Sequence, residues 1–388
     1  MDVLFTCAGG SGHLEPLVPI ARAAQDAGHN VGFVCRPRLI PLVEELGYRA
    51  FAAGSDVGLT PRRLPLAEID IEREMREVGE GFGCRIARER AADVLRLWEN
   101  RRPDLLVCEE FDFGPMIVAE RLAIPFATLQ VSASEQFVCA PIISRFLDAV
   151  RLEHGLPPDP ALMMPGRFLL LTPFPASLRV PPVPPPSTTR FVRVTGRGAA
   201  YGEDVLSRLP GQDNARTVYF TLGTVFNMES GDLFQRVVDG LGELPINLVV
   251  TVGRDIDPAE FGPQAPNVHI AQYVPQEGLL ARSDLVVSHA GSGSVLGALA
   301  HGLPMVLVPV GADQPLNAAR CKDLGVAEVL EAVSVTPQEI GESVCRVLHD
   351  PAHRIAAERI RDEIEKLPPP EYAVRMLEKL AVERQPMV

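Results

Sequence analysis

The chain has 388 residues, of which 46% are hydrophobic and 22% are charged. These are ordinary values for a folded globular protein, so they exclude a disordered chain, and the length predicts two domains. The 37 Lys and Arg residues against 50 Asp and Glu residues leave a net charge of −13. This balance argues against sequence-independent nucleic-acid binding, and any anionic ligand must therefore be held by local donors.

The cysteines and the apolar segments indicate a cytoplasmic protein. The seven Cys residues are an odd number and none form a CxxC pair, so reduced and buried thiols are expected. No targeting segment is visible at the start of the sequence. Residues 285–312 lack Asp, Glu, Lys and Arg and are long enough to span a membrane, but their Gly, Ser and Pro residues favour two strands flanking a buried helix. We therefore expect no stable membrane insertion.

The first half of the chain alternates between predicted strands and helices. An apolar run at residues 3–8 leads into a glycine-rich loop and then into a helix whose apolar residues recur every three or four positions. Together with the next apolar run they predict a βαβ unit with parallel pairing. The predicted strands of this half are residues 3–8, 31–35, 105–108, 126–131, 168–172 and 191–194.

The second half repeats this pattern. Its predicted strands are residues 218–222, 247–252, 268–271, 285–288 and 305–309, and its predicted helices are residues 233–241, 291–301, 315–324, 337–349 and 351–366. The boundaries that we predict are an N-terminal domain over 1–200, a linker over 201–215, a C-terminal domain over 216–366 and a terminal helix over 367–388 that packs back on the N-terminal domain. The fold class is α/β, with two facing doubly wound Rossmann-like domains. Ligands of such sheets bind at the carboxyl ends of the strands, which predicts an interdomain cleft.

The densest functional signal lies between residues 273 and 318. A Gly/Ser turn at residues 291–294 joins a predicted strand to a predicted helix, shortly after His289. Backbone N–H groups at the start of this helix, together with the serine hydroxyls, would form an anion site. Small residues could instead serve only to pack a helix tightly against a sheet. The flanking motifs, Tyr-Val-Pro-Gln at 273–276 and Asp-Gln at 313–314, favour the anion site.

This ordered set resembles the nucleotide-sugar signature of the family 1 glycosyltransferases of the GT-B fold, in particular the bacterial branch that decorates antibiotics and other natural products. The resemblance covers essentially the whole chain. It implies that the N-terminal domain binds the acceptor and the C-terminal domain binds a nucleotide sugar. The base would meet residues 273–274, the diphosphate His289 and the 291–294 turn, and the sugar hydroxyls residues 313–314. The implied donor-binding residues are Thr224, Tyr273, Val274, Gln276, His289, Gly291, Ser292, Gly293, Ser294, Asp313 and Gln314.

Position 297 departs from the family pattern. Relatives that use UDP-sugars commonly have Glu there, bonded to both ribose hydroxyls, whereas this chain has Gly297 and no other carboxylate in the turn. A deoxyribose has no 2′-hydroxyl to satisfy, so we expect a TDP-sugar rather than a UDP-sugar. Many relatives have Trp, Gly and Thr where this chain has Tyr273, Ala290 and Ser294, and we interpret these departures as conservative.

A second signal lies near the start of the chain, where Gly10-Ser11-Gly12-His13 follows the first predicted strand. A neutral imidazole suits the deprotonation of a hydroxyl near pH 7, and the resemblance implies that His13 is the general base. Such a base needs a carboxylate that fixes its tautomer and stabilises the imidazolium. The acidic residues after the predicted strand at 105–108 are Glu109, Glu110 and Asp112. Glu109 aligns best with the family, and Asp112 is the alternative.

The resemblance implies an inverting, metal-independent hexosyltransferase that moves a deoxysugar or other sugar from a TDP-sugar to a hydroxyl of a hydrophobic aglycone. No cofactor is expected beyond the nucleotide-sugar co-substrate. The segments 57–80 and 132–146 are candidate acceptor linings, and ordinary helix core explains them equally well. The side chains that would form the acceptor wall are Phe82, Phe137, Ile142, Ile143 and Phe146.

Several alternatives stay open. A sugar-nucleotide 2-epimerase shares the fold and would act without an acceptor. A UDP-sugar transferase, the lipid-linked N-acetylglucosamine transferase of cell-wall synthesis and a non-catalytic sugar-nucleotide-binding partner are the others. The sequence also leaves open the sugar, the aglycone, the attacking atom (O, N or C) and a homodimer. Asp255-Ile-Asp257 matches the DxD metal motif, but its Gly- and Pro-rich surroundings favour a surface turn, so we expect no metal site.

Overall fold

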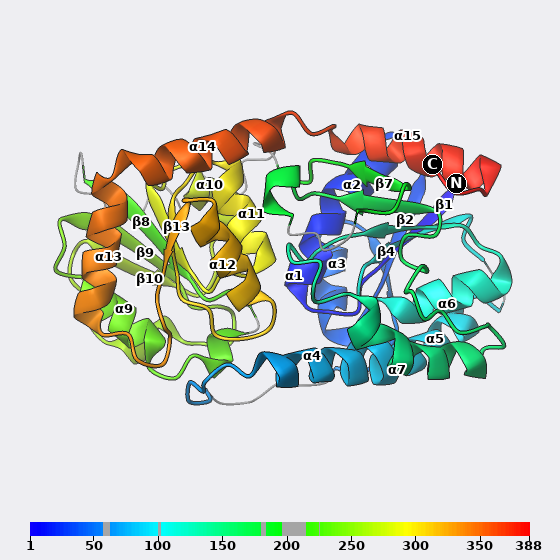
Figure 1. The fold of residues 1–388 in the computed structure, drawn as a ribbon, viewed down its shortest axis with the longest axis horizontal. Helices are drawn as coiled ribbons and strands as arrows, with labels where there is room; N and C mark the ends of the chain where they lie inside the picture. The colour runs from blue at the N-terminus through cyan, green and yellow to red at the C-terminus, as the bar shows by residue number, and fades with distance from the viewer. Residues whose placement is uncertain (57–62, 100–101, 180–183, 196–214, 225) are drawn as a thin grey trace. The chain divides into compact units, whose positions relative to one another are not determined.

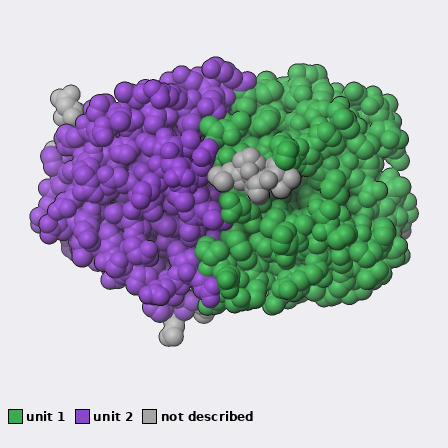
Figure 2. Space-filling view, viewed as in Figure 1, with its two compact units in different colours: residues 1–59, 71–194, 367–388 green, residues 60–70, 195–366 purple. Residues whose placement is uncertain are grey.

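The chain forms two compact units in the computed structural model, and Figure 2 colours them separately. Unit 1 comprises residues 1–59, 71–194 and 367–388, and unit 2 comprises residues 60–70 and 195–366. The structure describes residues 1–56, 63–99, 102–179, 184–195, 215–224 and 226–388. Residues 201–214 of the predicted linker lie outside these ranges.

Unit 1 is built on a parallel sheet of seven strands in the order β3-β2-β1-β4-β5-β6-β7 (Figure 1). Its strands are β1 (Asp2–Thr6), β2 (Asn30–Cys35), β3 (Arg49–Ala52), β4 (Leu105–Glu109), β5 (Phe126–Leu129), β6 (Leu169–Thr172) and β7 (Thr189–Phe191). Its α-helices are α1 (Ser11–Leu14), α2 (Val18–Asp26), α3 (Ile40–Glu45), α4 (Ile71–Glu80), α5 (Ala87–Leu97), α6 (Phe113–Leu122), α7 (Ala140–Glu153) and α15 (Pro370–Glu383). Short 3-10 turns occur at η1 (Glu15–Leu17), η2 (Pro37–Leu39) and η4 (Ala176–Leu178).

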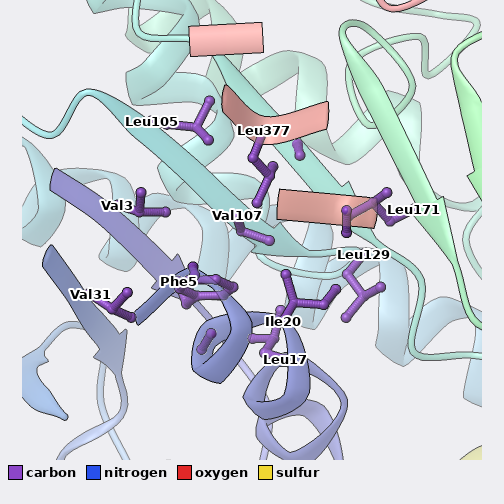
Figure 3. Close-up of a cluster of buried hydrophobic side chains, with 14 of the residues drawn as sticks. Val3, Phe5, Leu17, Ile20, Val31, Leu105, Val107, Leu129, Leu171 and Leu377 are labelled. Atoms are coloured by element: carbon purple, nitrogen blue, oxygen red, sulfur yellow. The ribbon is translucent and has the colours of Figure 1, made fainter. Parts of the chain in front are cut away.

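Alternate residues of these strands face two different helix layers, because successive side chains of a strand point to opposite faces of the sheet. On one face Val3 and Phe5 of β1 and Val107 of β4 lie in one apolar cluster with residues of α2 and α15 (Figure 3). On the other face Leu106 packs with residues of α5, α6 and α7. The C-terminal helix α15 contributes Leu377, which is buried in the first cluster.

Unit 2 is built on a parallel sheet of six strands in the order β10-β9-β8-β11-β12-β13. Its strands are β8 (Arg216–Thr221), β9 (Ile246–Thr251), β10 (Val268–Ala271), β11 (Leu285–Ser288), β12 (Met305–Leu307) and β13 (Ala327–Val329). Its helices are α9 (Leu233–Leu241), α10 (Gln276–Leu280), α11 (Ser292–Ala300), α12 (Gln314–Asp323), α13 (Pro337–His349) and α14 (Pro351–Glu365), with 3-10 turns η5 (Phe226–Glu229) and η6 (Pro258–Phe261). The predicted pair of doubly wound α/β halves is confirmed.

The apolar stretch at residues 285–312 is divided as expected into β11, the buried helix α11 and β12. Each piece is short, since β11 has four residues and α11 nine. No helix in the described ranges is long and apolar enough to cross a membrane.

Residues 63–70 stand in the N-terminal half of the sequence but belong to unit 2. The N–H of Leu64 donates to the carbonyl oxygen of Met228 at 2.7 Å, and the Leu64 carbonyl oxygen accepts from the N–H of Gly231 at 2.9 Å. Leu66 packs against the apolar core of unit 2. This segment therefore adds a short extended strap to unit 2, directly before α4 of unit 1.

Three elements differ from the prediction. The last strand of the first sheet is Thr189–Phe191 rather than 191–194, because the N–H of Arg193 donates at 2.7 Å to Pro368 ahead of α15 instead of to the sheet. The short edge strands β3 and β13 were not predicted. Residues 71–97 form one continuous helical stretch, in which a π-helical turn, η3 (Gly81–Ile86), links α4 to α5.

Candidate active site

In both sheets the predicted site residues lie where the strand order reverses. In unit 1 the chain builds outward from β1 through β2 and β3 on one side and through β4 on the other. Loops that leave the carboxyl ends of β1 and β4 therefore diverge and leave room for a ligand. His13 follows β1, and Glu109 is the last residue of β4. The equivalent point of unit 2 lies between β8 and β11, where Thr224 and His289 follow the strands.

His13 lies in α1, and its ring faces the end of β4. Its Nδ1 is 3.2 Å from Oε2 of Glu109, and a quarter of the His13 side chain (25%) is exposed, whereas that of Glu109 is fully buried. Gly9 makes this ring position accessible, because a Cβ at residue 9 would lie 2.2 Å from the ring carbons. Since Nδ1 faces the carboxylate, Nε2 is the nitrogen that remains to accept a proton from a substrate.

Glu109 is held as an anion by its surroundings. Its Oε1 accepts from the N–H of Ala8 at 2.9 Å, and its Oε2 accepts from the N–H of Phe111 at 2.8 Å. Burial alone would raise the pKa of Glu109, but the neighbouring His13 and the hydrogen bonds from His13, Phe111 and Ala8 outweigh burial and lower the pKa below its ordinary value. The carboxylate is therefore ionised at neutral pH and can stabilise a protonated imidazole.

The other two acidic candidates have different partners. Both oxygens of Asp112 accept from the guanidinium of Arg90, each at 2.6 Å, and both side chains are fully buried. Oε1 of Glu110 accepts from the backbone N–H groups of residues 131–132, at 2.8 and 2.5 Å. Our alternative assignment of Asp112 as the partner of His13 is corrected by this geometry, because Arg90 already occupies its carboxylate.

Sequence reasoning missed Arg90, although the sequence carries a signal for it. Ile86, Ala87, Ala91 and Val94 form the buried stripe of α5 and the turn before it, at spacings of one, four and three residues. Arg90 falls inside this stripe. A charged side chain on the apolar face of a helix requires a buried partner of opposite charge, so its position alone indicates a special role.

Two aromatic rings flank His13. The ring of Phe82 lies 6.0 Å from the His13 ring with an interplanar angle of 13°, and the ring of Phe111 lies 5.3 Å away at 60°. Phe82 is in the π-helical turn η3, and such turns frequently occur at functional sites. Phe82 is thus the acceptor candidate that lies against the base, and Phe111 is a neighbour that we did not predict.

The remaining acceptor candidates lie mostly in the core. Phe137 is 2% exposed and Ile143 is 0% exposed, so neither offers surface to a ligand, and the acceptor role that we gave to Phe137 is not supported. Ile142 and Phe146 are partly buried. A Cβ at Gly79 would lie 2.6 Å from the Phe146 ring, so this ring fills the contact between α4 and α7.

His289 of unit 2 follows β11 and is 7% exposed. Its ring fits between Gly223 and Gly291, where an added Cβ would lie 2.7 and 2.4 Å from the nearest ring atom, respectively. Burial lowers the pKa of His289 to about 4, and a hydrogen bond with the Thr221 backbone only partly opposes this shift. The ring is therefore neutral at pH 7 and can act as a neutral hydrogen-bond donor rather than as a cation.

The turn at the start of α11 is cross-linked to the start of α12. The hydroxyl of Ser292 donates to Oδ2 of Asp313 at 2.6 Å, and Nδ2 of Asn317 donates to the same oxygen at 2.8 Å. Oε1 of Gln314 accepts from the N–H of Val310 at 2.8 Å. Asp313 and Gln314 thus fix the loops around the turn, and Asn317 belongs to this network although we did not predict it.

Two alanines in these loops have a left-handed backbone, Ala290 with φ 66° and Ala312 with φ 49°. This region costs a residue with a Cβ about 1–2 kcal/mol. Ala290 in place of the glycine of many relatives is therefore not the conservative departure that we expected. Strain of this kind persists where the surrounding structure fixes the backbone, and it is common at ligand sites.

The segment at 273–276 combines an exposed ring with buried neighbours. Tyr273 is 49% exposed, and the guanidinium carbon of Arg254 lies 4.5 Å from its ring centroid. Val274 is buried. Nε2 of Gln276 is buried without a hydrogen-bond partner in the described part of the chain, and it faces the position of Gly297 on α11. Thr224 is exposed after β8.

Within the described residues, no three His, Cys, Asp or Glu side chains cluster as a metal site would require. Asp257 of the DxD sequence caps η6, where its carboxylate accepts from the N–H of Ala259 at 2.9 Å. This motif has a local structural role.

Comparison with known proteins identifies the class. The C-terminal domain model of the erythromycin biosynthesis protein CIII-like (EryCIII-like) family matches residues 235–380. The 3-alpha-mycarosylerythronolide B desosaminyl transferase of Saccharopolyspora erythraea is 27% identical, and the match covers 99% of each chain. Tylactone mycaminosyltransferase of Streptomyces fradiae is 28% identical over 98% of this chain and 92% of its own.

Solved structures match over the same length. Spinosyn rhamnosyltransferase SpnG complexed with thymidine diphosphate superposes with a TM-score of 0.81 at 24% identity, covering 97% of this chain and 100% of that chain. The calicheamicin glycosyltransferase CalG4 gives a TM-score of 0.78 at 22% identity over 100% of both chains. The fold is therefore GT-B, and the molecule is a glycosyltransferase. The chain belongs to the EryCIII-like bacterial natural-product branch of the family 1 glycosyltransferases, which confirms the resemblance found in the sequence.

Proposed function

We propose that the enzyme transfers a sugar, a deoxysugar in particular, from a TDP-sugar to a hydroxyl of a hydrophobic natural-product aglycone, with inversion at the anomeric carbon and with His13 as general base. The observation that carries this proposal is the contact between His13 and the buried, ionised Glu109 where the strand order of the first sheet reverses. Relatives named as desosaminyl and mycaminosyl transferases support the sugar class.

The acceptor half of the reaction follows from the tautomer. With Nδ1–H directed to Glu109, Nε2 of His13 takes the proton of the acceptor hydroxyl as the oxygen attacks the anomeric carbon. The bond from that carbon to the diphosphate oxygen breaks, and its electron pair leaves with the nucleotide diphosphate. Glu109 then stabilises the imidazolium. Phe82 and Phe111 give the base an apolar surround suited to a hydrophobic acceptor.

The donor half needs a site for the charge that develops on the leaving diphosphate. The N-terminus of α11, the Ser292 hydroxyl and the neutral ring of His289 supply preorganised donors in unit 2. Donors of this type remove the need for a divalent metal. Tyr273, half exposed, supplies a face for the base, and Arg254 packs on its ring.

The nucleotide assignment rests on Gly297 and on one of the neighbours. The structure of spinosyn rhamnosyltransferase SpnG was solved with thymidine diphosphate, which supports a TDP donor for this chain. Nothing in the described site selects an acceptorless reaction such as epimerisation.

Calorimetric titration with TDP and with UDP, without added metal, tests the donor class. Tight TDP binding with weak UDP binding is the expected result. A clear UDP preference would refute the role given to Gly297, and binding of neither nucleotide would favour a non-catalytic partner.

The variants His13→Ala and Glu109→Gln test the base. We expect His13→Ala to lose turnover with a TDP-sugar and an aglycone while it keeps TDP affinity, since His13 lies in unit 1 and the donor residues lie in unit 2. His29→Ala is a matched control on the same unit. Retained turnover in His13→Ala would overturn the assignment of the base.

A further inference from the structure

Arg90 is the largest fully buried side chain in the described part of the chain, and all its contacts lead towards the proposed base. Besides the two bonds to Asp112, its Nη1 donates to the carbonyl oxygen of Ala53 at 2.6 Å and its Nη2 to that of Val34 at 3.1 Å. Val34 lies in β2, and Ala53 directly follows β3. One guanidinium therefore joins three parts of the carboxyl edge of the first sheet.

The loop that Arg90 holds carries the partner of His13. Asp112 is three residues after Glu109, and its N–H donates to the Glu109 carbonyl oxygen at 3.0 Å. The N–H of Phe111 between them donates to the Glu109 carboxylate. A displacement of Asp112 would therefore move the Glu109 carboxylate and the Phe111 ring together.

Arg90 also belongs to the helical stretch that carries Phe82, eight residues before it across the π-helical turn η3. Phe82 and Phe111 contact each other with ring centroids 5.1 Å apart, and both contact His13. The ion pair of Arg90 with Asp112 thus ties together the two elements that hold the rings around the base.

The charges around the base explain why such a tie is needed. Glu109 and Asp112 are two fully buried carboxylates in one short loop, and only Glu109 contacts His13. Burial raises the pKa of Asp112, Arg90 opposes that shift, and the negative charge of Glu109 adds to it. The other titratable groups that face this cluster are Cys7, Cys35, Cys108 and Arg36.

We propose that Arg90 is a positioning residue for the base: by binding Asp112 it neutralises the second carboxylate of the loop and leaves Glu109 as the sole acidic partner of His13. This inference rests on the proposed role of His13. It differs from a purely structural role in its sign, because removal of the Arg90 charge and removal of the Asp112 charge must act on His13 in opposite directions.

The test is an NMR titration of His13 in isotopically labelled protein, with the signal assigned by its loss in His13→Ala. In Arg90→Met the unopposed Asp112 carboxylate should raise the midpoint by about half a pH unit or more. In Asp112→Asn the unopposed guanidinium should lower it by a similar amount. The double variant Arg90→Met/Asp112→Leu removes both charges and should return the midpoint towards wild type.

The acid limb of kcat/KM against pH should move in the same directions as the NMR midpoints, and Arg90→Lys, which keeps the charge, should stay near wild type. Equal midpoints in wild type, Asp112→Asn and Arg90→Met would overturn the proposal and leave Arg90 as a structural tie. If Arg90→Met does not fold, the isosteric Asp112→Asn decides by itself, because an unchanged or raised midpoint there refutes the proposal. The NMR shift reads the inference even if His13→Ala retains turnover, so failure of the proposed function is distinguishable.

Discussion

Gly297 should determine which nucleotide the donor site accepts, and its surroundings define what a replacement would meet. The residue lies inside α11, where a helix-forming side chain gains about 1 kcal/mol over glycine. A Cβ at this position would lie 3.0 Å from Cδ1 of Leu280 and 3.8 Å from Nε2 of Gln276. The Leu280 methyl is the end of a flexible side chain and can move by a few tenths of an ångström, so we expect Gly297→Ala to change the free energy of unfolding by less than about 1 kcal/mol.

Gly297→Glu introduces a carboxylate that has two competing partners. A hydrogen bond from a ribose 2′-hydroxyl to a charged acceptor contributes about 1.5–3 kcal/mol, which corresponds to roughly 10- to 150-fold in affinity. The amide nitrogen of Gln276 is buried without a partner in the described structure and lies within reach of the same carboxylate. Because Gln276 captures part of the new acceptor, we expect the ratio of UDP to TDP affinity to rise only about tenfold.

Calorimetric titration of both nucleotides measures that ratio. Gly297→Gln is the control for size without charge, and Gly297→Glu combined with Gln276→Leu should increase the ratio beyond that of the single variant. A folded Gly297→Glu protein with an unchanged ratio would refute the assignment of position 297 to the ribose. A ratio that falls in the combined variant would refute the competition by Gln276.

Three further expectations follow from the site. His289 has a folded-state pKa of about 4 against about 6.5 when unfolded, so the folded state binds fewer protons between these values and stability is lost as the pH falls through that window, by about 3 kcal/mol in total; His289→Gln should flatten this part of the stability profile in urea titrations, and His349→Gln, at an exposed site, should not. Ala290→Gly should relieve the strain at φ 66° and raise the free energy of unfolding by up to about 1 kcal/mol, whereas Ala298→Gly within α11 should lower it; equal losses in both melts would contradict the strain argument. Chelation by EDTA should leave the transfer rate unchanged, since backbone and side-chain donors meet the diphosphate charge; a rate restored only by Mg²⁺ would show that those donors are insufficient.

Much of the fold is legible in the sequence because parallel strands are buried on both faces and appear as unbroken apolar runs. The runs at residues 285–288 and 268–271 match β11 and β10 to the residue. β3 was missed because Arg-Ala-Phe-Ala at residues 49–52 is a short edge strand without a fully buried residue. The helical stretch at 71–97 was missed in part because Gly79, Gly81 and Gly83 interrupt its helical pattern.

The site shows the same division. The motif around His13 and the order of acidic residues after β4 bring out Glu109, and the sequence alone could not decide between it and Asp112. The decision depends on Arg90, which reaches Asp112 from 22 residues away in the sequence. Contacts of this kind depend on how helices pack on a sheet, so local pattern does not contain them. The strap at residues 63–70 is a further example, because its hydrogen-bond partners lie at residues 228–231.

The division of the chain has a consequence for the construction of hybrid enzymes. A single crossover in the 195–215 region, which looks like the natural joint, would exchange residues 195–388 as one block. That block includes Leu377 of α15, which belongs to the core of the first sheet, and it leaves behind the strap at residues 63–70, whose Leu66 belongs to the core of unit 2. Each half of such a hybrid would receive one foreign core element. Hybrids that keep native packing need four junctions, which retain residues 367–388 with the acceptor half and move residues 60–70 with the donor half.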